Sequence, residues 1–88
     1  MQKDKAIRYI DKWRENRKNV RFTDLLQVAS AFGFEFKGMK GSHVAYSRCD
    51  LKEILTFQDA AGKAKPYQVK QLIDLIDKYN LTEEVPNA

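Results

Sequence analysis

Residues 34–48 read FEFKGMKGSHVAYSR, in which two alternating segments flank a glycine-containing turn. Apolar and polar side chains alternate in Phe34-Glu35-Phe36-Lys37, and they alternate again over residues 42–48. This pattern is typical of half-buried strands, because successive side chains point to opposite faces of a sheet. Between the two segments, Gly38-Met39-Lys40-Gly41 supplies residues that readily adopt a positive φ. The stretch therefore predicts an antiparallel hairpin with one face toward a core.

A third strand is predicted over residues 53–58, after a turn at residues 49–52. Its apolar side chains, Leu55 and Phe57, again alternate with polar ones. Connections this short join antiparallel neighbours, so the three strands form a meander. The predicted core layer of the sheet comprises Phe34, Phe36, Val44, Tyr46, Leu55 and Phe57.

Three helices are predicted from apolar residues at helical spacing, over residues 4–17, 23–32 and 66–80. Thr23 is a candidate N-cap for the second helix, and Gly33 supplies its left-handed stop. Pro66 suits the first turn of the third helix, where its missing N–H does no harm. After that helix we expect a fraying tail over residues 82–88, because Pro86 disfavours a helix there.

The order helix, helix, three strands, helix indicates an α+β fold in which the helices cover one face of a three-stranded antiparallel sheet. A chain of 88 residues makes one domain. We assign residues 1–21 to a basic amphipathic helical extension and residues 22–81 to the main domain. A core of this size leaves little room for a deep pocket, so we expect no organic cofactor.

Charge is distributed unevenly along the chain. Residues 1–21 hold eight Lys and Arg against three acids, whereas residues 71–88 hold one Lys against four acids. Such asymmetry favours one side that faces a polyanion and another that faces solvent. The single cysteine, Cys49, cannot form an internal disulfide, which fits a reducing compartment. The polar N-terminus lacks an apolar signal region, so we expect a cytoplasmic protein.

His43 is the candidate catalytic residue. If Val44 and Tyr46 point into the core, strand alternation turns His43 to the open face of the sheet. Lys37 joins that face if Phe34 and Phe36 are buried. The same residues permit a simpler interpretation, in which His43 is an ordinary exposed strand residue.

RNA cleavage gives the functional interpretation of His43 a definite chemistry. The reaction needs a base for the 2′-hydroxyl, an acid for the leaving 5′-oxygen and positive charge around phosphorus, and imidazole suits either proton transfer. Lys37, Lys40 and the backbone N–H groups of Gly41 and Ser42 are candidates to hold the phosphate.

A second candidate RNA-binding segment lies at the start of the third helix and contains Lys63, Lys65, Tyr67 and Lys70. Helix N-termini attract anions, and a tyrosine can stack on a base. The alternative is a solvated loop with Tyr67 partly packed. The basic first helix likewise fits either a nucleic-acid contact or a solvated face with a packed underside.

Other chemistries lack the necessary residues. No second His and no clustered carboxylates accompany His43, so we predict no metal site. Ser42 and His43 are adjacent in sequence, so their side chains diverge and do not form a serine–histidine relay.

The run from Val20 to Leu81 resembles the HicA-like (YcfA-like) toxin family of toxin–antitoxin systems. The similarity is carried by Gly41-Ser42-His43 together with Lys65-Pro66-Tyr67-Gln68-Val69-Lys70-Gln71, supported by shorter matches. Those matches are Val20-Arg21-Phe22, Asp24-Leu25, Gly33-Phe34, Glu53-Ile54-Leu55 and Gly62-Lys63-Ala64.

This resemblance implies an α-β-β-β-α fold like that of double-stranded-RNA-binding domains. It further implies metal-independent cleavage of mRNA with His43 as the essential residue, and a HicB-like antitoxin as partner. Two departures accompany it: Val44 stands where many members have a second histidine, and a helix precedes Val20.

Three functions remain open from the sequence. The chain is an endoribonuclease toxin, a non-catalytic RNA-binding module, or an antitoxin-binding domain without nuclease activity.

Overall fold

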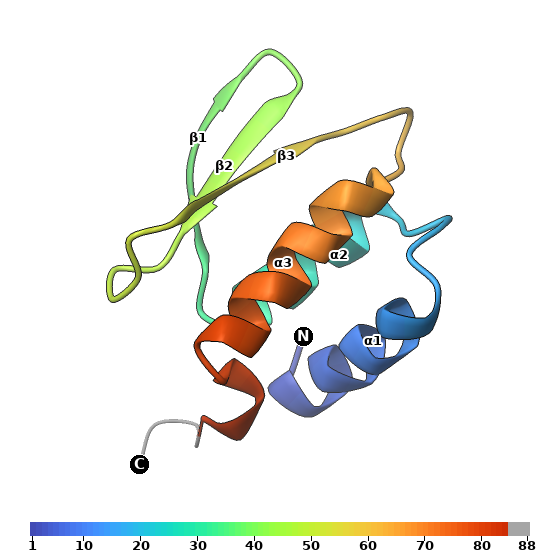
Figure 1. Cartoon of the computed structure of the whole chain (residues 1–88). Coiled ribbons are helices and arrows are strands. Elements are labelled where there is room, and N and C mark those ends of the chain that lie inside the picture. Colours follow the sequence, from blue (N-terminus) through green and yellow to red (C-terminus); the bar gives the residue numbers. More distant parts are fainter. Residues whose placement is uncertain (85–88) are drawn as a thin grey trace.

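The computed structural model describes residues 1–84 as three α-helices, three strands and a short 3₁₀ helix (Figure 1). In chain order the elements are α1 (Lys3–Glu15), α2 (Phe22–Ala31), β1 (Glu35–Lys40), β2 (His43–Ser47), β3 (Ile54–Gln58), α3 (Pro66–Lys78) and η1 (Leu81–Glu83). The predicted α+β class and element order are confirmed. Within residues 1–84, no helix is long and apolar enough to cross a membrane.

The sheet has the order β1-β2-β3, and both pairs of neighbours are antiparallel. The turn between β1 and β2 is shorter than the four residues predicted, since β1 continues to Lys40 and only Gly41 and Ser42 lie between the strands. Gly41 adopts a φ of +61°, which glycine tolerates without strain. Lys40 is consequently a strand residue directly opposite His43.

A β-bulge interrupts the pairing of β1 with β2. Phe36 lies opposite Tyr46 and Gly38 opposite Ala45, so Lys37 is the extra residue. An extra residue reverses the faces of all positions that follow it, compared with simple alternation. Met39 therefore shares a face with Val44, its partner, and Lys40 shares the other face with His43.

Helices α2 and α3 lie side by side against one face of the sheet (Figure 1). Buried side chains from the sheet and from the three α-helices form one core. Those of the sheet include Val44, Tyr46, Leu55 and Phe57. Phe34 is also buried, but it precedes β1.

The prediction that Phe36 belongs to the core is wrong. Its side chain is 55% exposed and Met39 is 67% exposed, although both lie on the helix-facing side of the sheet. β1 is an edge strand, and the β1–β2 hairpin projects past the ends of α2 and α3 (Figure 1). Phe36 still contacts the Tyr46 ring edge-on, with 6.0 Å between centroids.

Helix α1 packs on α2 and α3, on the side away from the sheet (Figure 1). Its buried residues Ala6, Ile10 and Trp13 belong to the same core cluster as the sheet residues. The segment assigned as an extension therefore contributes to the single core of the domain.

Two element ends differ from the predictions. Helix α2 begins at Phe22, and Thr23 does not cap it. Instead, the Phe22 N–H donates to the Gly62 carbonyl at 2.9 Å, so a neighbouring loop satisfies this helix end.

The start of the segment expected to fray, residues 82–84, is ordered. Residues 82 and 83 belong to η1, and the Glu84 carboxylate accepts hydrogen bonds from Arg48. The rest of the predicted tail, residues 85–88, lies outside the described residues.

Candidate nucleic-acid interface

His43 is the first residue of β2, and its side chain is exposed on the face of the sheet that α2 and α3 leave open. Its partners in the ladder are Lys40 on β1 and Gln58 on β3. Directly opposite residues place their side chains on one face about 5 Å apart. The uncovered face thus carries a row of lysine, histidine and glutamine across all three strands.

Gln58 links this row to the loop before α3. Its side-chain nitrogen donates to the Ser42 hydroxyl at 3.3 Å, and its side-chain oxygen accepts a hydrogen bond from Lys65 Nζ at 3.1 Å. The Asp59 N–H also donates to the Ser42 carbonyl at 3.3 Å. Lys65, which lies 22 positions after His43 in the sequence, is thereby held at the strand end beside the imidazole.

Gln68 fixes the position of Gln58 from beneath. The Gln68 side chain is buried, at 1% exposure, between α3 and the outer edge of β3. In the amide orientation that satisfies both groups, its oxygen accepts from the Gln58 N–H at 2.7 Å and its nitrogen donates to the Gln58 carbonyl at 3.2 Å. The side chain thus replaces the strand neighbour that an edge residue lacks.

Neither glutamine was singled out from the sequence as a site residue. A signal for Gln68 existed, because it lies four residues before Leu72 on the buried stripe of α3. A polar residue on such a stripe needs a hydrogen-bonding partner. No comparable signal marked Gln58.

The other predicted site residues occupy three different environments. Lys37 is exposed in the bulge, and the ladder pairs of Gly38 and Met39 separate it from the His43 row. Lys63 and Tyr67 are exposed on either side of the Lys65 contact, and the interpretation of Tyr67 as partly packed does not hold, since it is 55% exposed. Lys70 forms an ion pair with Asp74 at 2.8 Å, so part of its charge is neutralised within α3.

The lysines around the His43 row have no acidic partner in the described residues. Among residues 1–84, none of Lys37, Lys40, Lys63 and Lys65 forms an ion pair; the paired cations are Lys3, Arg14, Arg48, Lys70 and Lys78. A group of unpaired cations on an open sheet face produces the positive potential that attracts a phosphate chain.

The two largest pKa shifts, those of Glu53 and Arg48, arise at the opposite end of the sheet. Hydrogen bonds from Lys78 and Tyr79 lower the pKa of Glu53 to about 2. Hydrogen bonds to Glu84 and Asp50 raise the pKa of Arg48, whose guanidinium also donates to the Phe32 carbonyl at 2.8 Å. These interactions join β2, β3 and η1 to the helices and leave the His43 row outside the network.

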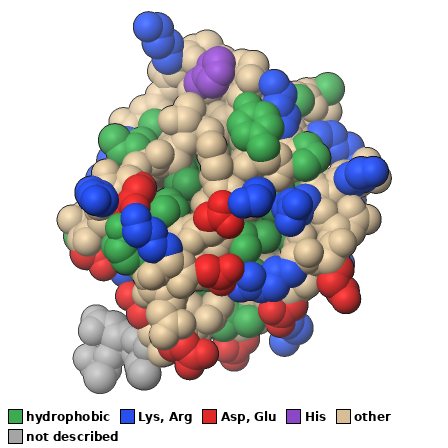
Figure 2. Space-filling model, in the orientation of Figure 1, with side chains coloured by type: hydrophobic (Ala, Val, Ile, Leu, Met, Phe, Trp, Pro, Cys, Tyr) green, Lys and Arg blue, Asp and Glu red, His purple; other side chains and the backbone are tan. Residues whose placement is uncertain are grey.

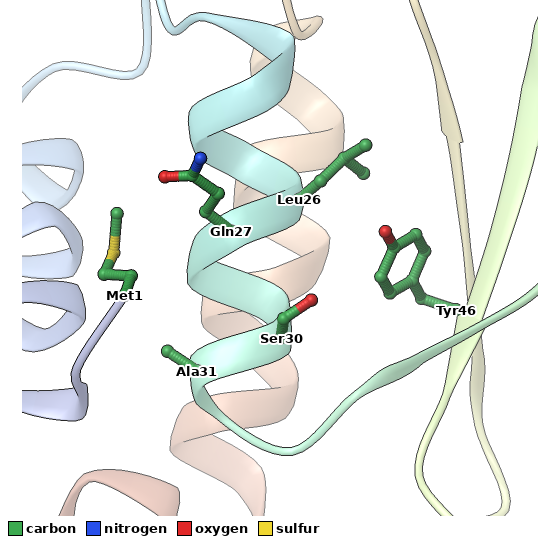
Figure 3. Close-up of a pocket in the computed structure, with 6 residues that line it drawn as sticks. All are labelled: Met1, Leu26, Gln27, Ser30, Ala31 and Tyr46. Atoms are coloured by element: carbon green, nitrogen blue, oxygen red, sulfur yellow. The ribbon is translucent and has the colours of Figure 1, made fainter.

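A cavity of about 240 Å³ lies between α2 and β2, on the side of the sheet away from His43 (Figure 3). Tyr46 faces Leu26 and Ser30 across it, and Met1 lies at its α1 side. Its volume is below the range usual for organic ligands. The open face of the sheet gathers the predicted site residues and lysines without acidic partners in the described chain, and it is the better candidate for binding a polyanion.

Searches of family models, curated proteins and solved structures found no match to this chain.

Proposed function

We propose that this protein is an endoribonuclease that cleaves single-stranded mRNA with His43 as its catalytic residue, and that it is the toxin of a toxin–antitoxin pair. The observation that supports the chemistry is the row of Lys40, His43 and Gln58 on the uncovered face, with Lys65 hydrogen-bonded to Gln58. It combines a proton carrier with unpaired positive charge at one exposed place.

The proposed reaction is transfer of the phosphate to the neighbouring ribose hydroxyl. The 2′-hydroxyl loses its proton and attacks phosphorus, and the bond to the 5′-oxygen breaks as that oxygen gains a proton. His43 performs one of the two proton transfers, for which an imidazole suits physiological pH. Lys40, Lys65 and the N–H groups of the Gly41-Ser42 turn stabilise the charge that develops on the phosphate.

The fold part of the proposal is a double-stranded-RNA-binding-domain-like core. From Phe22 onward the elements run α2-β1-β2-β3-α3, which is the order that the HicA resemblance implies. Within the resemblance, Val44 replaces a second histidine and is buried. The proposal therefore gives the imidazole role to His43 alone.

The proposed partner is a HicB-like antitoxin protein. Phe36 and Met39 form an exposed apolar strip along β1, on the hairpin that carries His43. Exposed apolar patches commonly mark protein interfaces. The strip lies on the helix-facing side of the sheet and His43 on the other side, so a partner that blocks RNA would reach around the edge strand β1.

Two other functions are favoured by particular features. A non-catalytic RNA-binding module needs only the unpaired lysines, with His43 incidental. An antitoxin-binding domain without nuclease activity needs only the strip of Phe36 and Met39.

The deciding experiment is RNA cleavage by wild type and His43→Ala in buffer containing EDTA. Loss of a general acid or base costs about 10²- to 10⁴-fold in rate, so His43→Ala should reduce cleavage by at least about 100-fold. Ser47→Ala, on the same face of β2 but at its far end, is the matched control and should cleave normally. Circular dichroism should show both variants folded.

Equal cleavage by His43→Ala and wild type would refute the catalytic assignment. Binding without products would favour the RNA-binding module. Growth arrest on expression, relieved by His43→Ala and by a co-expressed antitoxin, would support the toxin assignment.

A further inference from the structure

Most cations of α1 and of the turn after it have no acidic partner. Of the eight Lys and Arg in residues 1–21, only Lys3 and Arg14 form ion pairs within the described part of the chain. The unpaired ones are Lys5, Arg8, Lys12, Arg17, Lys18 and Arg21. The fold therefore keeps a second group of uncompensated positive charges outside the His43 row.

Three of these cations, Lys12, Lys18 and Arg21, line a hollow at the C-terminal end of α1. Its volume is about 210 Å³, and its lining includes Tyr9, Lys12, Asn16, Lys18, Arg21 and Asp24. Lys12 Nζ lies 5.7 Å from the centre of the Tyr9 ring, so a cation and an aromatic face are presented together. Asp24 is the one acid in that lining. Cations interleaved with aromatic rings are the usual surface for a single-stranded nucleic acid.

The hollow is continuous with the His43 row through two loops that lie side by side. The Ala64 N–H donates to the Val20 carbonyl at 2.8 Å, and Arg21 forms a β-bridge with Lys63. Lys65 follows on the same loop and donates to Gln58, the ladder partner of His43. A strip of cations thus runs from α1 over the two loops to the open face that carries His43. We name it the basic strip, and its members are Lys12, Lys18, Arg21, Lys63, Lys65 and Lys40.

Several acids that form ion pairs lie away from the basic strip, whereas the acidic neighbours of the strip itself include Asp24 and Asp59. Glu84 pairs with Arg48 and Lys3, and Asp77 pairs with Arg14. Figure 2 shows lysines and arginines but no acidic side chain around the histidine at the top of that face, and acidic side chains mixed with lysines and arginines lower down. This separation gives a polyanion one favourable path across the molecule.

We infer that α1 and the turn at residues 16–21 bind the backbone of a single-stranded RNA whose scissile phosphate lies at His43. The inference rests on the proposed function and extends the RNA path beyond the hairpin and the Lys63–Lys70 segment. The Tyr67 ring is 55% exposed beside the basic strip and offers a stacking surface to a base, whereas the Tyr9 ring is half-buried and packs against Trp13. An acidic protein segment has no use for such stacking, and for that reason RNA is the favoured occupant.

The test measures RNA affinity against salt concentration in a His43→Ala background, which prevents cleavage. The probe is oligouridine RNA of increasing length. The variant Lys18→Gln/Arg21→Gln removes two charges of the basic strip, and Lys52→Glu is the control. Lys52 is exposed and unpaired among the described residues, lies in the turn between β2 and β3, and changes the net charge by the same −2.

For single strands, the slope of log K against log salt changes by about 0.7 per phosphate contact. The double variant should therefore lower the slope by about 1.4, and Lys52→Glu should lower it by much less. At about 0.1 M salt the affinity of the double variant should fall roughly 10- to 25-fold. The loss should appear only with RNA long enough to reach past the hairpin. Lys12→Gln, on the surface of α1, is a second variant whose slope should fall by about 0.7.

Several outcomes separate this inference from the proposed function. If wild type cleaves RNA normally and the double variant binds RNA like the Lys52→Glu control, the inference about α1 is overturned while the proposed function stands. If the double variant shows the smaller salt slope but wild type cleaves no RNA, the result would support the basic strip and refute the nuclease. Competition by polyglutamate as strong as by RNA, or no RNA binding at all, would overturn the inference.

Discussion

Replacement of Gln68 by leucine tests whether the buried amide holds β3 on α3. Leucine has a similar volume and suits the surrounding core, but it offers no hydrogen bond. The substitution leaves the Gln58 N–H and carbonyl without the partners that they have at 2.7 and 3.2 Å. An unsatisfied buried backbone group costs about 1–3 kcal/mol. Gln58 is half-buried, so water can compensate in part, and we take the lower end of that range for each group.

The expected loss is therefore about 2 kcal/mol of unfolding free energy, or about 8–16 °C in Tm for a domain of this size. Urea unfolding followed by the fluorescence of Trp13, the single tryptophan, measures it directly. Gln71→Leu, on the exposed side of α3, is the control and should change the free energy by less than about 0.5 kcal/mol. If Gln68→Leu matches that control, the amide is not a structural link and the placement of Gln58 has another cause.

Three further predictions concern other parts of the domain. Leu81→Ala should destabilise the protein by about 3 kcal/mol in urea unfolding, because the side chain is fully packed; a change below about 1 kcal/mol would show that η1 is dispensable. Glu53→Gln should lower Tm at neutral pH. Since the folded pKa of about 2 lies below the ordinary value of 4.5, the carboxylate stabilises fully above pH 4.5, and the difference in Tm should vanish as the pH falls toward 2. A constant difference over that range would contradict the Lys78 and Tyr79 contacts. Phe36→Ser should leave stability within about 1 kcal/mol yet weaken binding to an antitoxin partner in titration calorimetry; unchanged binding would exclude the strip on β1 as its docking surface.

Much of the fold follows from periodicity in the sequence. The switch from helical spacing to alternation at Phe34 located the hairpin, and the glycine after α2 and the proline at the start of α3 marked helix ends. These features are local, so they can be predicted before any tertiary contact is known.

The faces of β1 were harder to predict, because the bulge breaks the alternation on which the prediction rested. Gly38 was the available signal, since a glycine within a strand often marks a bulge. The exposure of Phe36 had no local signal, because it depends on how far the helices extend over an edge strand.

The candidate site combines local and long-range information. The outward direction of His43 followed from its buried neighbours on β2. The contact between Lys65 and Gln58, and the proximity of the α1 turn to Lys63, depend on how loops meet after folding. Alternation and spacing describe single elements and do not contain that information.

The bulge in β1 also has a consequence for how the hairpin can change over generations. Lys37 is a surplus residue: without it, Phe36, Gly38, Met39 and Lys40 would keep their present partners in an uninterrupted ladder. A lineage could therefore lose this codon, or exchange it for another, and retain the geometry around His43. The hairpin can thus alter its charge in a single genetic step. By contrast, an insertion directly after Met39 would turn Lys40, the ladder partner of His43, to the opposite face.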